Sequence, residues 1–155
     1  MNRDESRARV PELPPSRWSS ALIAPRDGLG QGTWIGVMPN GAWACLLNSY
    51  EPVNVSARRP SRGLLVPTIL AANDPEQLLQ SLVLSNYMPF RLLIGSKVAP
   101  MLYHWDGKAL RRRAISTLPY FVSSSSWQAE RVLAERATTF KMWVTAHPLC
   151  RDLYR

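Results

Sequence analysis

The clearest pattern in the chain is a pair of apolar runs on either side of a turn. Residues 34–38 and 42–47 are apolar with little polar alternation, and Asn40-Gly41 lies between them. An Asn-Gly pair between two β-prone runs is typical of a tight hairpin, and continuous apolar strands are typical of a sheet covered on both faces. The pattern therefore predicts a β-hairpin at the centre of a sandwich.

Helical spacing of apolar residues follows in the middle of the chain. Residues 64–70 predict a short helix that starts near Pro67 or is kinked at it, because proline disrupts a helix interior. Asp74 and Pro75 then supply an N-cap and a first helical residue for a second short helix, which we expect to end at Leu84.

The strongest helical pattern covers residues 127–146, where the apolar side chains fall on one face of a helix. Ser126 is the expected N-cap, and Pro148 lies beyond the end. We therefore expect a long amphipathic helix to close the fold.

The remaining segments are short and β-prone, or irregular. Strands are expected at residues 90–94, 101–105, 108–115 and 120–123. They predict a second antiparallel sheet, whereas residues 1–30, with four prolines, predict an extended surface segment. Strands, a helix pair, more strands and a closing helix indicate an α+β layered fold, and 155 residues is a common size for one domain, here 1–155.

Composition supports a folded chain without a membrane span. Hydrophobic residues make up 46% and charged residues 19%, unlike a disordered chain. No apolar run approaches the ~20 residues of a membrane helix, and Met1 precedes polar residues instead of a signal-peptide core, so we expect a cytoplasmic protein. Cys45 and Cys150 have neither the spacing of a metal site nor that of a disulfide framework.

The chain is basic, with a formal net charge of +8. Such a charge suits nucleic acid, anionic lipid or an acidic small ligand. The arginines cluster at residues 58–62 and 111–113 without any motif of a nucleic-acid-binding fold, so we interpret them as solvated and expect no nucleic-acid partner.

An ordered set of motifs gives the chain a family resemblance. Asn2-Arg3-Asp4-Glu5 resembles the signature of the NRDE family, which is also described as the transport and Golgi organisation family. Matching segments follow in order at residues 32–37, 40–41, 46–48, 61–63, 90–95 and 123–126. The resemblance thus covers nearly the whole chain.

The NRDE family in turn resembles N-terminal-nucleophile amide hydrolases, which have an αββα-type sandwich of antiparallel sheets. In these enzymes an N-terminal Cys attacks the amide carbonyl, its α-amino group acts as the base, and an Asn side chain stabilises the oxyanion. By this resemblance, Asp4 corresponds to the acid that orients the nucleophile and Asn48 to the oxyanion Asn, and Ser124 replaces a second Asn.

The chain departs from this pattern at its start, because Met1 directly precedes Asn2 and no N-terminal thiol is present. Either the reading frame starts at an internal Met or this version lacks the first strand. A strand is also expected after the last helix, so we expect a sandwich without its first strand and a domain truncated at both ends.

Two functional hypotheses follow. The first is a non-catalytic protein that binds a small hydrophobic or acyl-bearing anionic ligand of the haem or acyl-thioester (acyl-CoA) class, requiring no cofactor or metal. The second is an amide or ester hydrolase whose Cys-bearing N-terminus is missing. The resemblance assigns ligand binding to Asn2, Arg3, Glu5, Arg62 and Ser124. From the residues alone, Asp4 and Glu5 are equally typical of solvated or capping acids near a terminus, and residues 61–63 of a simple helix start.

Overall fold

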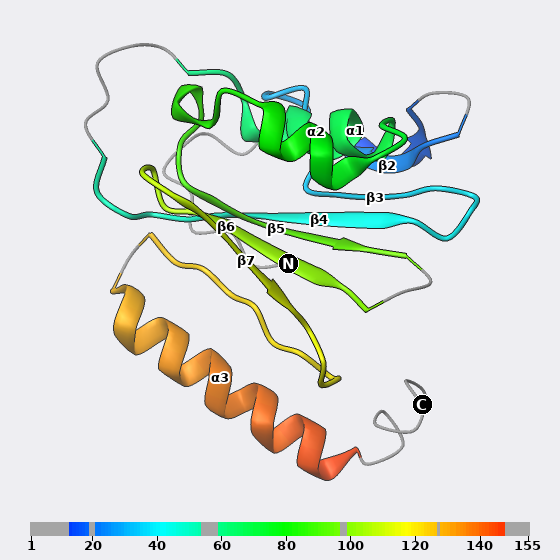
Figure 1. The fold of residues 1–155 in the computed structure, drawn as a ribbon. Coiled ribbons are helices and arrows are strands. Elements are labelled where there is room, and N and C mark those ends of the chain that lie inside the picture. The colour runs from blue at the N-terminus through cyan, green and yellow to red at the C-terminus, as the bar shows by residue number, and fades with distance from the viewer. Residues whose placement is uncertain (1–12, 19–20, 54–58, 97–98, 127, 148–155) are drawn as a thin grey trace.

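The computed structural model describes residues 13–18, 21–53, 59–96, 99–126 and 128–147. These residues form one seven-stranded antiparallel sheet in which the strands follow one another in chain order (Figure 1). The strands are β1 (Leu13–Arg17), β2 (Ile23–Arg26), β3 (Ile35–Val37), β4 (Trp43–Asn48), β5 (Phe90–Gly95), β6 (Met101–Trp105) and β7 (Leu110–Ala114). The helices are α1 (Leu65–Leu70), α2 (Pro75–Ser81) and α3 (Ala129–Ala146), with short 3-10 turns at Arg62–Leu64 and Leu84–Asn86.

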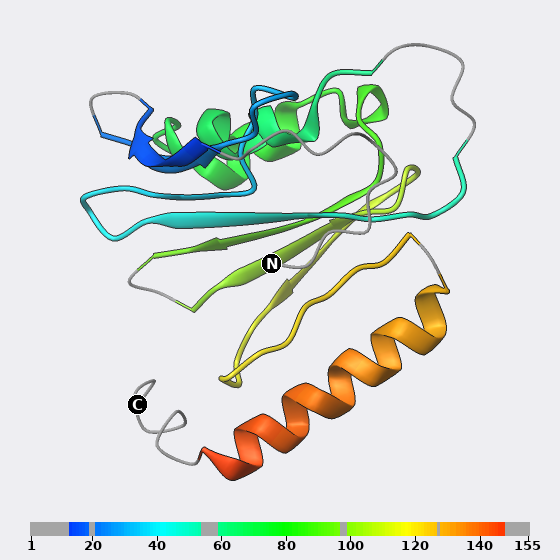
Figure 2. The ribbon, with the colours of Figure 1, turned by 180° about the vertical axis from the view of Figure 1, so that it is seen from behind.

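The sheet separates two layers, with α1 and α2 on one side and α3 on the other (Figures 1 and 2). This arrangement confirms an α+β fold. The described residues form a single sheet, so the expected second sheet was wrong, and the αββα layering is not found in this part of the chain. The β4–β5 ladder from Trp43 to Asn48 joins the two groups of strands that we expected to lie in separate sheets.

The main core lies between the sheet and α1 with α2. Alternate residues of β4 to β6 point toward these helices, because side chains of a strand alternate between its faces. We call this side the helix-covered face, and its residues are Ala44, Leu46, Phe90, Leu92, Tyr103 and Trp105. Helix α1 packs Leu65, Val66, Ile69 and Leu70 against it, each 5% exposed or less. Gly36 lets β3 approach this helix, since an added Cβ would lie 3.2 Å from Leu70 Cδ1 and 3.3 Å from Val66 Cγ1.

The expected hairpin is confirmed and has the predicted turn. Gly41 has φ +85°, which glycine adopts without strain, and Asn40 Oδ1 accepts a hydrogen bond of 3.0 Å from the Ala42 amide. The hairpin lies inside the sheet, since β3 pairs with β2 and β4 pairs with β5. No edge of this hairpin is left unpaired.

Helix α2 begins where the sequence predicted. Asp74 is its N-cap and accepts a hydrogen bond of 2.9 Å from the Gln77 amide, and Pro75 is the first helical residue. The helix ends at Ser81, earlier than expected. Helix α3 is also confirmed, but the expected cap Ser126 was wrong: its N-cap is Gln128, with φ 42° and no side-chain cap hydrogen bond.

The segment expected to be extended and on the surface contains strands β1 and β2, and all five residues of β1 are exposed. The Pro14-Pro15 pair is tolerated because β1 is the edge strand of the sheet. The strand expected at residues 120–123 was wrong, since these residues do not form a strand. The carbonyls of Ser123 and Ser124 accept hydrogen bonds from Arg91 and Arg136 instead of from a neighbouring strand.

Candidate functional site

The side of the sheet that faces away from α1 and α2 is apolar yet incompletely covered. We call it the opposite face, and its residues are Ile23, Ile35, Val37, Trp43, Cys45, Leu47, Arg91, Leu93, Leu102, His104, Arg111 and Arg113. On β2 and β3, Ile23 is 44% exposed, Ile35 40% and Val37 46%. Three neighbouring β-branched side chains thus form an exposed apolar strip beside Trp43, the cross-strand partner of Val37.

Toward β7 the same face becomes basic. The strand register aligns Leu47, Arg91, His104 and Arg111 in one row across β4 to β7. Side chains directly opposite one another on antiparallel strands have Cβ atoms about 5 Å apart, so Arg91, His104 and Arg111 are direct neighbours. One face therefore combines an exposed apolar strip with a row of basic side chains.

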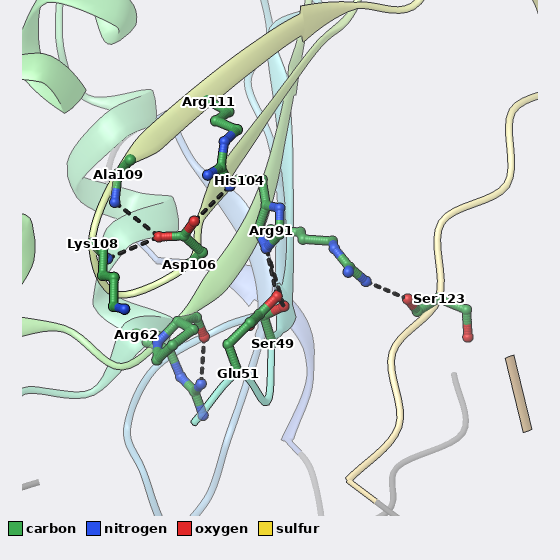
Figure 3. A network of polar contacts seen from close by, with 11 residues as sticks. Ser49, Glu51, Arg62, Arg91, His104, Asp106, Lys108, Ala109, Arg111 and Ser123 are labelled. Carbon is green, nitrogen blue, oxygen red and sulfur yellow. Dashed lines mark hydrogen bonds and ion pairs between the residues drawn. The ribbon is translucent and has the colours of Figure 1, made fainter. Parts of the chain in front are cut away.

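A small polar network lies at the end of β4 (Figure 3). Glu51 Oε1 accepts a hydrogen bond of 2.9 Å from Ser49 Oγ and lies 2.7 Å from His104 Nε2. Glu51 Oε2 is buried and has no hydrogen-bond partner among the described residues. Burial raises the pKa of Glu51, but the hydrogen bonds from Ser49, from its own backbone and from His104 outweigh it and leave the pKa lowered. The network holds the chain after β4 against β6.

The network differs from a nucleophilic triad in its connectivity. Ser49 Oγ lies 3.5 Å from His104 Nε2, the same nitrogen that contacts Glu51. In a triad the hydroxyl and the carboxylate engage different ring nitrogens, so that the ring accepts a proton from one side while the acid orients the other. The Ser49 hydroxyl also donates to Glu51 and is therefore not activated by His104.

A match to a known protein family covers almost the entire chain. Residues 1–149 match the family described as Transport and Golgi organisation 2. The chain belongs to this family. It is the same family as the NRDE family, so the resemblance drawn from Asn2-Arg3-Asp4-Glu5 and the later motifs is confirmed. No curated protein matched the chain in a sequence search.

For this member of the Transport and Golgi organisation 2 family, the structure separates the predicted site residues. Asn48 ends β4 in the same alternation as Leu46 and so lies on the helix-covered face. Ser124 lies on the other side of the sheet, where its carbonyl accepts a hydrogen bond of 2.7 Å from Arg136 Nη1. The two residues are not brought together. Asn2, Arg3, Asp4 and Glu5 lie outside the described residues.

Arg62 has a clear structural contact. Its Nη1 donates a hydrogen bond of 2.7 Å to the carbonyl of Pro89, just before β5 (Figure 3). The backbone of the adjacent Gly63 passes very close to Gly32. A Cβ added to Gly32 would lie 2.7 Å from the carbonyl carbon of Gly63. The Thr33 amide donates to Gly63 O at 3.0 Å. Residues 61–63 therefore fix the start of the helix layer against β3.

Two further ionisable groups, Cys45 and Asp106, have shifted pKa values with clear physical causes. Burial raises the pKa of the half-buried Cys45 thiol, which disfavours the reactive thiolate. The backbone amides of Ala109 and Lys108, followed by Arg111, lower the pKa of Asp106 to about 2. Arg111 Nη1 lies 2.5 Å from Asp106 Oδ2 (Figure 3). In the described part of the chain, no three metal-ligating side chains gather.

Sequence reasoning missed Glu51, Arg91 and His104 as site candidates. Each is an isolated polar residue beside apolar or proline neighbours, and only the pairing of β5 with β6 and the return of the chain after β4 bring them together. A signal was present in Arg91, a charged residue inside an apolar strand of Leu and Ile.

No helix within the described ranges is long and apolar enough to cross a membrane.

Proposed function

We propose that this chain binds a small hydrophobic ligand that carries an anionic group, of the acyl-thioester or haem class, and that it does so without catalysis. The observation that carries the proposal is the opposite face, which holds both the exposed strip of Ile23, Ile35 and Val37 on β2 and β3 and the row of Arg91, His104 and Arg111 on β5 to β7, with β4 between them. An acyl-bearing anion needs both features on one surface. Membership of the Transport and Golgi organisation 2 family is compatible with this role but does not specify it.

The alternative, hydrolysis of an amide or ester, receives less support. It requires an activated nucleophile, whereas the pKa of Cys45 is raised and Ser49 is bound to the acid of its own network. We therefore expect no turnover of acyl-amides by the purified chain. Turnover that is lost on Cys45→Ala substitution would overturn this expectation.

Calorimetric titration with a decanoyl thioester of coenzyme A tests the binding role. Val37→Asp places a charge on the apolar strip, and we expect it to weaken binding by about tenfold or more, because a carboxylate there would be desolvated by the acyl chain. Val83→Asp is the matched control, since Val83 is 63% exposed and follows α2. Equal affinities for both variants and the unmodified chain would contradict the proposed surface, and no binding at all would contradict the function.

The residues assigned by the family resemblance form a separate part of the proposal, because Arg62 begins the helix layer and does not belong to the opposite face. Loss of a charge-assisted hydrogen bond typically costs about 1–3 kcal/mol, so Arg3→Ala or Arg62→Ala is expected to weaken anion binding by this amount. Because Arg62 also holds the Pro89 carbonyl, its variant needs a parallel measurement of unfolding. Unchanged affinity in both variants would remove Arg3 and Arg62 from the site.

A further inference from the structure

The two edges of the sheet differ in whether another strand can pair with them. Strand β1 begins the sheet and β7 ends it, so each has one side without a neighbouring strand among the described residues (Figure 1). On β1 the Pro14-Pro15 pair lacks backbone N–H groups, and the ladder with β2 is irregular between Leu13 and Ser16. Both features blunt an edge. Strand β7 contains no proline and pairs with β6 in regular register, so it is the edge to which a strand can be added.

The ladder with β6 determines which backbone groups of β7 point away from the sheet. The Ile115 amide donates a hydrogen bond of 2.8 Å to the carbonyl of Pro100, a hydrogen-bonded pair that continues the register of the ladder. Hydrogen-bonded and non-hydrogen-bonded pairs alternate along antiparallel strands, so the N–H and C=O groups of Leu110, Arg112 and Ala114 point outward. No other backbone group of the described chain forms a hydrogen bond with them.

The segment that follows β7 does not pair with this edge. Arg113 lies over the ring of Tyr120, 5.2 Å from its centroid, and Arg91 on β5 donates to Ser123 O. Both arginines belong to the opposite face, so residues 120–123 turn onto that face. Ala114 has only a methyl side chain and is exposed. The outward backbone groups of β7 are therefore accessible.

The side chains along this edge are basic. The three central residues of β7, at positions 111–113, are arginines. Asp106 pairs with Arg111 and Glu76 with Arg112, so two acids face three arginines. The side chains of Arg111 and Arg112 are still 66% and 61% exposed. Exposed ion pairs are weak and a guanidinium has five donors, so a further carboxylate can share these groups.

The charges decide which strand this edge accepts. A second copy of β7, aligned antiparallel about Arg112, would place Arg112 opposite Arg112 and Arg111 opposite Arg113. Like charges directly opposite one another destabilise a strand pair, so the edge disfavours self-association. In an acidic strand, three consecutive carboxylates would instead lie opposite the three arginines, with Cβ atoms about 5 Å apart. The same charges that reject other strands therefore select this one.

We propose that β7 binds an extended acidic segment of a partner protein, which adds a strand to the sheet. The backbone groups of Leu110, Arg112 and Ala114 form the new ladder, and the arginines at 111–113 select carboxylate side chains. Backbone hydrogen bonds supply affinity and the side chains supply specificity, as in other cases of strand addition. This inference does not rest on the proposed ligand binding.

Fluorescence anisotropy with labelled, capped peptides tests the edge. The probe is Thr-Val-Glu-Glu-Glu-Val-Thr, and at low salt we expect it to bind the full chain about tenfold more tightly than the same peptide with Gln in place of Glu. N-methylation of the central Glu removes the N–H that reaches the carbonyl of Arg112, and should weaken binding by about tenfold. N-methylation of the next Glu is the matched control, because its N–H points away from β7.

Variants of the chain test the same contacts from the other side. Ala114→Pro removes an outward N–H without removing a hydrogen bond to β6, and should weaken binding of the acidic peptide by about tenfold. Arg113→Gln should reduce the preference for Glu over Gln several-fold. Arg17→Gln is the control, because it removes an exposed arginine from β1, at the other edge of the sheet. Unfolding midpoints establish which variants are folded.

The possible outcomes bear on different parts of the proposal. Equal affinities for the Glu and Gln peptides overturn the acidic partner, and equal losses from the two N-methylated peptides overturn strand addition. Absence of binding overturns both. A dimer of the unmodified chain that Ala114→Pro dissociates would show that β7 pairs with itself, and would also overturn the proposal. If Ala114→Pro does not fold, Arg113→Gln and the N-methylated peptides decide.

Discussion

The two faces of the sheet differ in how they are covered, although the same strands build both. On the helix-covered face, Leu92 is fully buried under α1 and α2, while the next residue of β5, Leu93, is only partly buried. On β3, Gly36 lies against α1, whereas its neighbours Ile35 and Val37 are 40% and 46% exposed. The first face supplies stability, and the second leaves apolar and basic side chains exposed to solvent.

The largest expected effect comes from truncating the same residue type on the two faces. Leu92→Ala should lower the free energy of unfolding by about 2–5 kcal/mol, because it leaves a cavity in the main core. Leu93→Ala should cost about 1 kcal/mol, since its side chain already contacts solvent. Urea unfolding of both variants measures the difference. Equal losses would show that the opposite face is as well packed as the core.

The next effect concerns the aromatic part of the opposite face. Trp43 lies across Gly95, where an added Cβ would be 2.2 Å from Trp43 Cε2. Gly95→Ala should displace the indole ring and cost about 1–3 kcal/mol, the usual range for overpacking. In a Trp43→Ala background the same change should cost much less, since nothing then occupies the space. A double-mutant cycle measures this coupling, and additive costs would contradict the contact.

These contrasts also explain which parts of the fold were predictable. The turn at Asn40-Gly41 and the cap at Asp74 are local, so the sequence alone identified the hairpin and the start of α2. The single sheet was missed because the pairing of Asn48 with Phe90 joins residues far apart in the chain, with no local signal. Strand β1 was missed because its prolines, which are usual in loops, are also compatible with an edge strand.

The site was less predictable than the fold. Motifs identified the family, but the site residues carried over from the resemblance include Asn48, assigned to the oxyanion, and Ser124, assigned to the ligand, which lie on different sides of the sheet. The row of Arg91 and His104 depends on the register of β5 with β6, and a shift of one residue in this pairing would place the two side chains on opposite faces. Register of this kind is set by long-range pairing and is not visible in residue order.

A smaller effect is expected from the polar network beside the opposite face. The folded pKa of Glu51 lies below its ordinary value of 4.5, so its ionised form stabilises the fold above that pH. This contribution is lost as the pH falls through the lower folded pKa. Glu51→Gln should remove that part of the acid dependence and cost about 1–2 kcal/mol at neutral pH, because the contacts with Ser49 and His104 weaken.

Urea unfolding across the acid range measures this effect, with Glu130→Gln on exposed α3 as the matched control. The control should keep the acid dependence of the unmodified chain. An unchanged acid profile in Glu51→Gln would mean that the network does not contribute to folding.

The smallest effect is expected at Arg112, which alternates with Arg111 and Arg113 along β7 and so lies on the helix-covered side. Its ion pair with Glu76 is solvent-exposed, and Arg112→Ala should cost less than about 1 kcal/mol and leave ligand affinity unchanged. The pKa of Tyr103 is raised to about 12, first by burial and then by the charge and hydrogen bond of Glu76. The positive charge of Arg112 acts in the opposite direction and lowers this pKa. Removing that charge should therefore move the Tyr103 titration to still higher pH. Tyrosinate absorbance measures the shift, and a shift to lower pH would contradict the position of Arg112 beside Tyr103.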